Sequence, residues 1–187
     1  MYGKAIKVIL TLTLLALFGC TSSGVPKQSF VRENANLNLL QTVAVMPFEG
    51  GGRASRIREL ANTQQLAHEY VDVVEKRRVD VFQHQETLNP GAPLAEFTLR
   101  RLGETLGVQA ALLGSVEMIN QSRGSSAFLE VTMTMRLVQC DTGQVIWQAS
   151  GMASGYSLAD RLFGFAPKDT FDVTMDLLEE LFATMQQ

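Results

Sequence analysis

The alternation of apolar and polar positions predicts a series of short strands in this chain. Strands are predicted over residues 41–48 and 109–118, because their central residues are apolar on both faces, as in covered sheet strands. Residues 128–139 alternate strictly between apolar and polar, so one face of that strand packs and the other meets water. Asp141–Gly143 then predicts a hairpin turn into a strand over residues 144–149.

Apolar residues at helical spacing predict three helices. The first covers about residues 59–76. The second runs from Pro93 to Leu106, with Phe97 facing inward and Gly107 as its left-handed end. The third covers residues 169–185, where acidic residues suit the N-terminal helix dipole. Its predicted apolar stripe consists of Phe171, Met175, Leu178, Leu181, Phe182 and Met185.

A further short strand is predicted at residues 79–82, between the first two helices. The resulting order is strand, helix, strand, helix, three strands, helix. Alternation of strands and helices favours parallel pairing in the first half, and consecutive strands favour an antiparallel meander in the second. The sequence therefore predicts an α/β (α+β) fold with a mixed sheet of about five strands, packed by three helices.

The first 19 residues have the layout of a bacterial secretion signal. Lys4 and Lys7 provide a positive start, and residues 6–18 are almost wholly apolar but too short to cross a bilayer, which needs about 20 residues. Gly19 precedes Cys20, an arrangement that resembles a lipobox. We expect cleavage before Cys20 and acylation of its thiol. An ordinary signal peptide and an uncleaved anchor are the alternatives.

The residues that follow Cys20 predict an address and a tether. Thr21 stands where an aspartate would resemble an inner-membrane retention signal, so we expect the outer membrane, with the protein at its periplasmic face. Residues 20–38 are polar and rich in turn formers, which indicates a flexible acylated tether that reaches at most about 60 Å. Residues 39–187 form the predicted globular domain.

Charge and cysteine content exclude several classes of function. Removal of residues 1–19 leaves 14 basic and 19 acidic side chains, and this acidic balance has no general attraction for nucleic acid. Cys140 is the only other cysteine, which excludes an intramolecular disulfide and a metal site with several sulfurs when Cys20 is acylated. We interpret Cys140 as a partly buried spectator, with intermolecular pairing as the alternative.

Motifs for catalysis and ligand binding are incomplete in this sequence. The Gly50–Gly52 turn lacks the Lys-Ser/Thr that follows a phosphate-binding loop. Asp141–Gly143 spells one aspartic-protease tripeptide, whereas that chemistry requires two carboxylates sharing a proton. His68 and His84 are the only imidazoles and lie on separate predicted elements. We expect no catalytic residue, no metal and no cofactor, and a hydrolase is only a third hypothesis.

Residues 151–167 gather apolar side chains between two predicted elements, with glycines among them. Exposed apolar clusters mark contact sites, so this segment is predicted either to bind a partner or to dip into a membrane. A loop folded over the sheet is the alternative. The candidate partner-binding residues are Tyr156, Leu158, Leu162, Phe163 and Phe165.

Three structural motifs carry a resemblance to a known family. They are a first strand that ends in Pro-Phe at residues 43–49, a Gly within the apolar strand of residues 106–116, and a Thr-Gly hairpin in residues 135–147. Together they resemble the CsgG and TolB N-terminal-domain group of bacterial outer-membrane lipoproteins, with relatives such as LpoB and FlgO. The resemblance covers about residues 41–149 and implies a fold more than a function.

The signal segment, the incomplete catalytic motifs and the resemblance together predict a non-enzymatic lipoprotein that acts as a binding and assembly accessory factor in the cell envelope. Its expected partners are envelope proteins, other copies of itself, and the membrane through its acyl chains, but not nucleic acid. CsgG-like channels add membrane-spanning hairpins, and residues 120–127 read as a polar turn too short to hold one. The alternative function is a ring-forming component of a CsgG-like envelope secretion or transport assembly.

Overall fold

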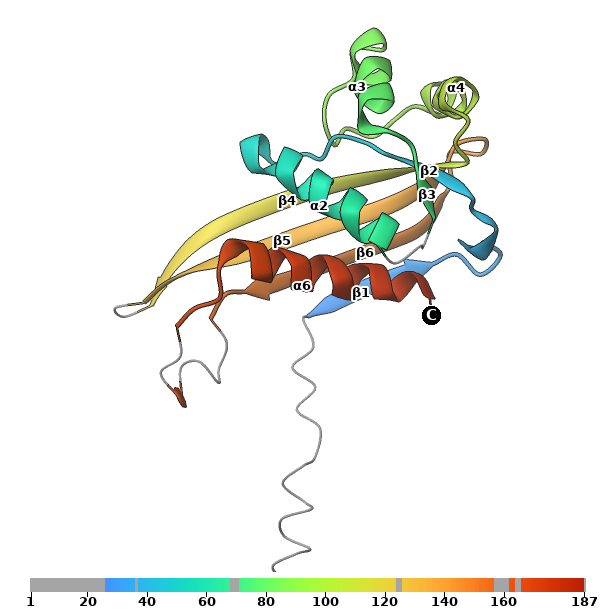
Figure 1. Cartoon of the computed structure of the whole chain (residues 1–187). Coiled ribbons are helices and arrows are strands. Elements are labelled where there is room, and N and C mark those ends of the chain that lie inside the picture. The colour runs from blue at the N-terminus through green and yellow to red at the C-terminus, as the bar shows by residue number, and fades with distance from the viewer. Residues whose placement is uncertain are drawn as a thin grey trace, which may run out of the picture.

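The computed structural model describes residues 26–35, 37–67, 71–123, 126–156, 162–163 and 166–186. A single six-stranded sheet runs through this part of the chain, in the order β1-β6-β5-β4-β2-β3 (Figure 1). Within the described ranges, no helix is both long and apolar enough to cross a membrane. The strands are β1 (Lys27–Val31), β2 (Thr42–Val45), β3 (Asp72–Val73), β4 (Ala110–Arg123), β5 (Ser126–Gln139) and β6 (Val145–Ser154).

The sheet is mixed, as the sequence predicts. β2 pairs in parallel with both β3 and β4, whereas β4, β5, β6 and β1 pair antiparallel. The sixth strand is β1, which lies inside residues 20–38, where we expected a flexible tether. β1 is an exposed edge strand, so its sequence Lys-Gln-Ser-Phe-Val lacks the apolar alternation that reveals a buried strand. Only its pairing with β6 defines it.

Among the described residues, four α-helices pack on the sheet, where three were expected. The additional helix is α3, which replaces the strand predicted at residues 79–82. Val79 and Phe82 lie three residues apart on its buried face, while Val81 between them is 49% exposed. The first predicted helix is also shorter than expected, because β3 begins at Asp72. The helices are α2 (Ala54–Ala67), α3 (Lys76–Gln85), α4 (Glu96–Leu106) and α6 (Thr170–Phe182).

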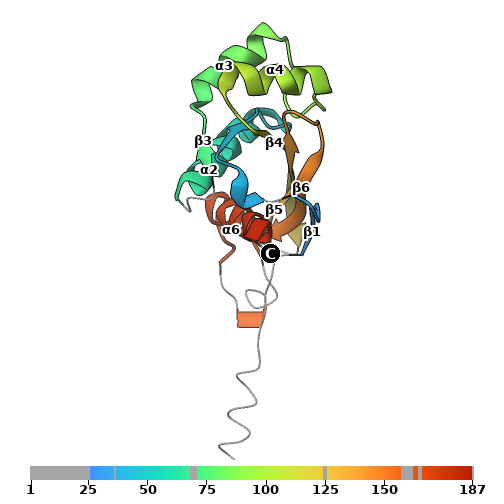
Figure 2. The ribbon, with the colours of Figure 1, turned by 90° about the vertical axis from the view of Figure 1, so that its right-hand side faces the viewer.

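The sheet separates two apolar cores. α2 and α6 cover one face, and α3 and α4 lie together at the far end of the molecule (Figures 1 and 2). The larger core packs β4, β5 and β6 against α2 and α6 around Trp147, Met133 and Phe182. The smaller core packs α3 and α4 against the opposite face around Leu102 and Leu113. The described part of the chain also contains three 3₁₀ segments: η1 (Leu37–Leu39), η2 (Gly51–Arg53) and η3 (Ala183–Gln186).

The end of α4 is confirmed, but one of its expected core residues is not. Gly107 ends α4 in the left-handed conformation, with φ of 73°. Phe97 is 68% exposed instead of inward, because it lies two residues before Leu99, on the opposite side of the helix from the buried leucines. Its ring lies 5.7 Å from the Arg101 guanidinium.

The β4–β5 hairpin is longer than the sequence indicates. Its two strands have 14 residues each, and their register runs from the pair Ala110 and Gln139 to the pair Arg123 and Ser126. Residues 120–127, which we expected to be a turn, are therefore mostly paired strand. Figure 1 shows the hairpin extending past α6. Its outer residues are polar because neither face of this part packs fully on a core.

Candidate functional site

The described chain begins beside the end of β6. The carbonyl of Pro26 accepts a hydrogen bond from the N–H of Met152 at 3.1 Å. Lys27, the first residue of β1, pairs with Gly151. We call this region the tether-side end, because Cys20 precedes Pro26 by only six residues. Cys20 itself lies outside the described residues.

The predicted contact residues divide into three groups. Leu158 and Phe165 lie outside the described residues. Tyr156 is partly buried, and its ring lies 5.6 Å from the ring of Phe128 on β5. Leu162 and Phe163 are 81% and 71% exposed. The structure therefore packs Tyr156 against the long hairpin and leaves two large apolar side chains at the surface.

Three further apolar side chains are exposed near the tether-side end. Ile119 on β4 and Met152 on β6 are each 43% exposed, and Phe171 at the start of α6 is 56% exposed. Phe171 was expected in the buried stripe of its helix, but Val173 and Leu177 face the core in its place. Met152 lies in the outward phase of β6, between the buried Gly151 and Ala153, and this alternation continues the strand beyond residue 149, where we expected it to end.

The outward face of β4, β5 and β6 is polar along most of its length. Thr134 and Ser150 share a hydrogen bond of 2.9 Å between their hydroxyl oxygens, and Gln121 donates to Glu130 at 3.0 Å. This face presents hydrogen-bonding groups to solvent and is suited to polar contacts. We call it the open face, and its central residues are Ser115, Glu117, Thr132, Thr134, Arg136, Gln148 and Ser150.

A cleft of about 710 Å³ lies at the opposite end of the strands from the tether-side end. Its lining includes Leu39, Arg100, Gln109 and Cys140. Cys140 is 3% exposed, and burial together with the neighbouring Asp141 raises the pKa of its thiol to about 12. A thiol with such a pKa stays protonated at neutral pH and is a poor nucleophile.

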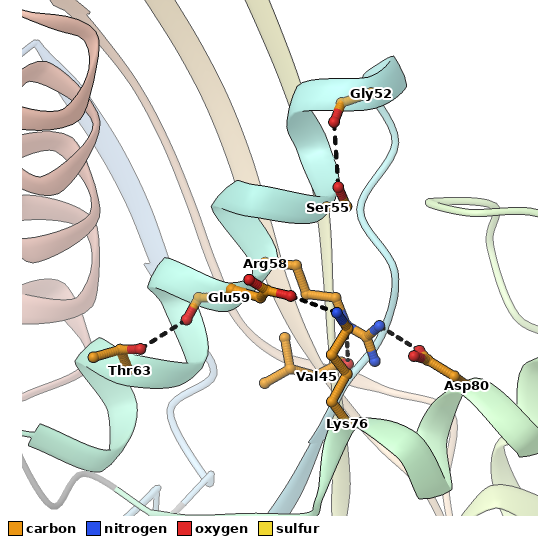
Figure 3. A network of polar contacts seen from close by, with 8 residues as sticks. All are labelled: Val45, Gly52, Ser55, Arg58, Glu59, Thr63, Lys76 and Asp80. Carbon is orange, nitrogen blue, oxygen red and sulfur yellow. Dashed lines mark hydrogen bonds and ion pairs between the residues drawn. The ribbon is translucent and has the colours of Figure 1, made fainter.

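A polar network links α2 to α3 past the end of β2 (Figure 3). Arg58 donates from Nε to the carbonyl of Val45 at 2.9 Å and pairs through Nη1 with Asp80. Beside it, Lys76 pairs with Glu59, and this ammonium lowers the pKa of the Glu59 carboxyl. Because α2 and α3 pack on opposite faces of the sheet, these contacts hold the two layers together and have a structural role.

The candidate motifs for chemistry form ordinary turns and helix surface. Asp141–Gly143 closes the β5–β6 hairpin, where the N–H of Gly143 donates to the carbonyl of Gln139 at 2.9 Å. His84 lies in the last turn of α3, and His68 is outside the described residues. Among the described residues, no group of three or more His, Cys, Asp or Glu side chains is placed to hold a metal ion.

Solved structures share this fold at low sequence identity. PelC from Paraburkholderia phytofirmans, a dodecamer with one Leu-to-Met substitution, aligns with a TM-score of 0.59 and 16% identity, covering 87% of this chain and 98% of that one. Lipoprotein GNA1162 from Neisseria meningitidis aligns with a TM-score of 0.56 and 13% identity, covering 79% and 99%. At these identities the likeness shows the fold alone. No protein-family model matches the chain, and no curated protein matches it.

The C-terminal domain of LpoB from Escherichia coli also aligns, over 60% of this chain and 81% of that one. The TM-score of this alignment is 0.44, at 17% identity. The chain shares its fold with bacterial proteins, one of which is lipoprotein GNA1162.

Proposed function

We propose that this protein is a non-enzymatic lipoprotein, held by acyl chains on Cys20 at the periplasmic face of the outer membrane. There it acts as a binding and assembly accessory factor for other envelope proteins. One observation carries the proposal: a signal sequence that ends in a lipobox-like cysteine is joined, six residues later, to a fold also found in lipoprotein GNA1162.

The side chains of the described residues support a binding role over catalysis. The Cys140 thiol is buried and protonated at neutral pH, which makes it unsuitable as a nucleophile. Arg58, the buried cation, is engaged with a backbone carbonyl and with Asp80 between two helices. The open face and the cleft instead present amides, hydroxyls and charges to solvent.

Anchoring would make weak contacts effective. A diacylated and amide-acylated cysteine binds a leaflet stably, since each buried methylene contributes about 0.8 kcal/mol. A domain fixed near the membrane meets other membrane-bound proteins at a high effective concentration. The polar open face then needs only modest affinity to hold an envelope partner.

Replacement of the anchor cysteine tests this proposal. Cys20→Ala is expected to abolish incorporation of labelled palmitate, to move the protein out of the membrane fraction, and to lose crosslinked envelope partners. Cys140→Ala is the matched control, because it removes the other cysteine and leaves the lipobox intact. Equal palmitate labelling of Cys20→Ala and the native chain would refute the anchor, and recovery of free monomer alone from crosslinked envelopes would refute the accessory role.

A ring-forming component of an envelope secretion or transport assembly is the second candidate. The observation in its favour is that PelC, which shares the fold, was solved as a dodecamer. Mass photometry of the detergent-solubilised lipoprotein separates the two candidates. A discrete high-order oligomer supports the ring, whereas a monomer supports the accessory factor.

A further inference from the structure

The position of β1 sets how far the domain can lie from its anchor. If the whole of residues 20–38 were extended, the domain would hang up to about 60 Å from the membrane. In the structure, however, β1 is part of the sheet, and six residues of sequence separate Cys20 from Pro26. At roughly 3.3 Å per residue, this segment spans at most about 20 Å.

The span also limits which part of the sheet can lie next to the leaflet. β1 joins the sheet at Gly151, which pairs with Met133 near the middle of the 14-residue strand β5. Gln139, beside the cleft, lies six residues further along that strand, or about 20 Å at roughly 3.3 Å per residue. The tether therefore keeps the start of β1 close to the leaflet, and the contacts made by the tether-side end decide whether the cleft points away from it.

The surface of the tether-side end is suited to lipid. Leu162 and Phe163 are among the most exposed large apolar side chains of the described residues. In Figures 1 and 2, the short ribbon of residues 162–163 lies beyond α6, on the side of the molecule away from α3 and α4. Met152, whose N–H binds the carbonyl of Pro26, places another exposed apolar side chain at the point where the tether joins the sheet.

These apolar side chains come from separate elements, and the cleft lies at the other end of the strands. Separate apolar side chains that project beside a lipid anchor suit contact with a bilayer, because fluid acyl chains pack around side chains of irregular arrangement. The described lysines at this end are paired: Lys27 with Glu180, and Lys168 with Asp176. These two ammonium groups are therefore partly neutralised, and the proposed contact rests on the apolar side chains.

We propose that the tether-side end inserts Leu162 and Phe163 into the leaflet that holds the acyl chains, which fixes one orientation of the domain on the membrane. This inference rests on the proposed lipid anchor. According to this inference, the exposed side chains of Leu162 and Phe163 contact lipid rather than a protein partner. The fixed orientation holds the cleft at the end away from the bilayer and leaves the open face for an envelope partner.

Fluorescence quenching by lipids with brominated acyl chains tests the inference on the full-length lipoprotein in phosphatidylcholine vesicles. Phe163→Trp and Leu162→Trp place a reporter at the proposed contact. Phe97→Trp is the matched control, because Phe97 is 68% exposed, close to the 71% of Phe163, but lies on α4 at the far end. The native Trp147 is fully buried and gives the background signal.

We expect the reporters at 163 and 162 to be quenched at least twofold more than the reporter at 97, whose emission should match the background. We expect the same result when anionic lipid is added. Equal quenching at 97 and 163, or none at 163 and 162, overturns the inference.

Flotation of the vesicles separates the two proposals. A chain that floats with vesicles but shows no quenching at 163 and 162 retains its anchor and contradicts only the lipid contact. A chain that does not float contradicts the lipid anchor, and the orientation that depends on it fails too.

Discussion

The indole Nε1 of Trp147 donates a hydrogen bond of 3.0 Å to the hydroxyl oxygen of Thr184. That hydroxyl in turn donates to the carbonyl of Leu181 at 2.7 Å, and both Trp147 and Thr184 are almost fully buried. The Trp147 ring also stacks on Phe182, with 6.2 Å between ring centroids. These contacts fasten the C-terminal end of α6 to β6, in the centre of the larger core.

Thr184→Val is expected to destabilise the fold by about 1–3 kcal/mol, because it leaves a buried indole N–H without its acceptor. Urea denaturation of the purified protein measures the change. Thr63→Val is the control: Thr63 is exposed on α2 and its loss should change stability by no more than about 0.5 kcal/mol. Equal midpoints for Thr184→Val and the native protein would show that the hydrogen bond contributes nothing.

Gly114 lies beneath the ring of Phe48, and a Cβ atom at this position would come within 2.8 Å of that ring. Gly114→Ala is expected to cost about 1–3 kcal/mol through overpacking. Gly52→Ala is the matched control, since nothing lies within 4 Å of a Cβ there. If thermal melting shows both variants alike, the close packing of Phe48 on β4 is wrong.

Asp80→Asn is expected to lower stability by about 1–3 kcal/mol, because the side chain of Arg58 is only 4% exposed and would be left as a buried, unpaired cation. Glu59→Gln is the control, because it breaks the neighbouring ion pair between Glu59 and Lys76. Both of these side chains are exposed, so the urea midpoint should not change. A larger loss from Glu59→Gln than from Asp80→Asn would contradict the assignment of Arg58 as the structural link.

Cys140 is expected to resist alkylation in the folded protein. In the Cys20→Ala variant it is the only cysteine, so iodoacetamide labelling reports on it alone. A rise in the thiol pKa from 9.0 to about 12 lowers the thiolate fraction about a thousandfold at pH 8. Labelling in urea is the control, and equally fast labelling of native and unfolded protein would refute the buried, protonated state.

The same shift predicts how stability depends on pH. Because the folded state retains the Cys140 proton above pH 9 while the unfolded state loses it, stability should fall as pH rises from about 9 towards 12. Cys140→Ala should show a smaller decline over this range. Denaturation midpoints of the two proteins at pH 8, 9 and 10 measure the difference.

Local periodicity was enough for elements whose burial pattern is strong. β5 alternates strictly between apolar and polar residues from Leu129 to Leu137, and Gly107 and Asp169 mark helix boundaries that the structure confirms. Local periodicity gave the wrong element for residues 79–82, because an apolar pattern over only four residues does not distinguish a helix from a strand. Phe97 and Phe171 were wrongly predicted to be buried. The buried side of each helix is set by neighbouring leucines and valines, and both phenylalanines lie outside it.

The sequence by itself determined the signal-like start with Cys20, the mixed sheet and most of the core, because these depend on composition and short-range spacing. Only the tertiary structure decided that residues 27–31 join the sheet, since an exposed edge strand is defined by its pairing with β6 and carries no apolar signal of its own. That pairing brings Pro26, which follows Cys20 by six residues in the sequence, beside Met152.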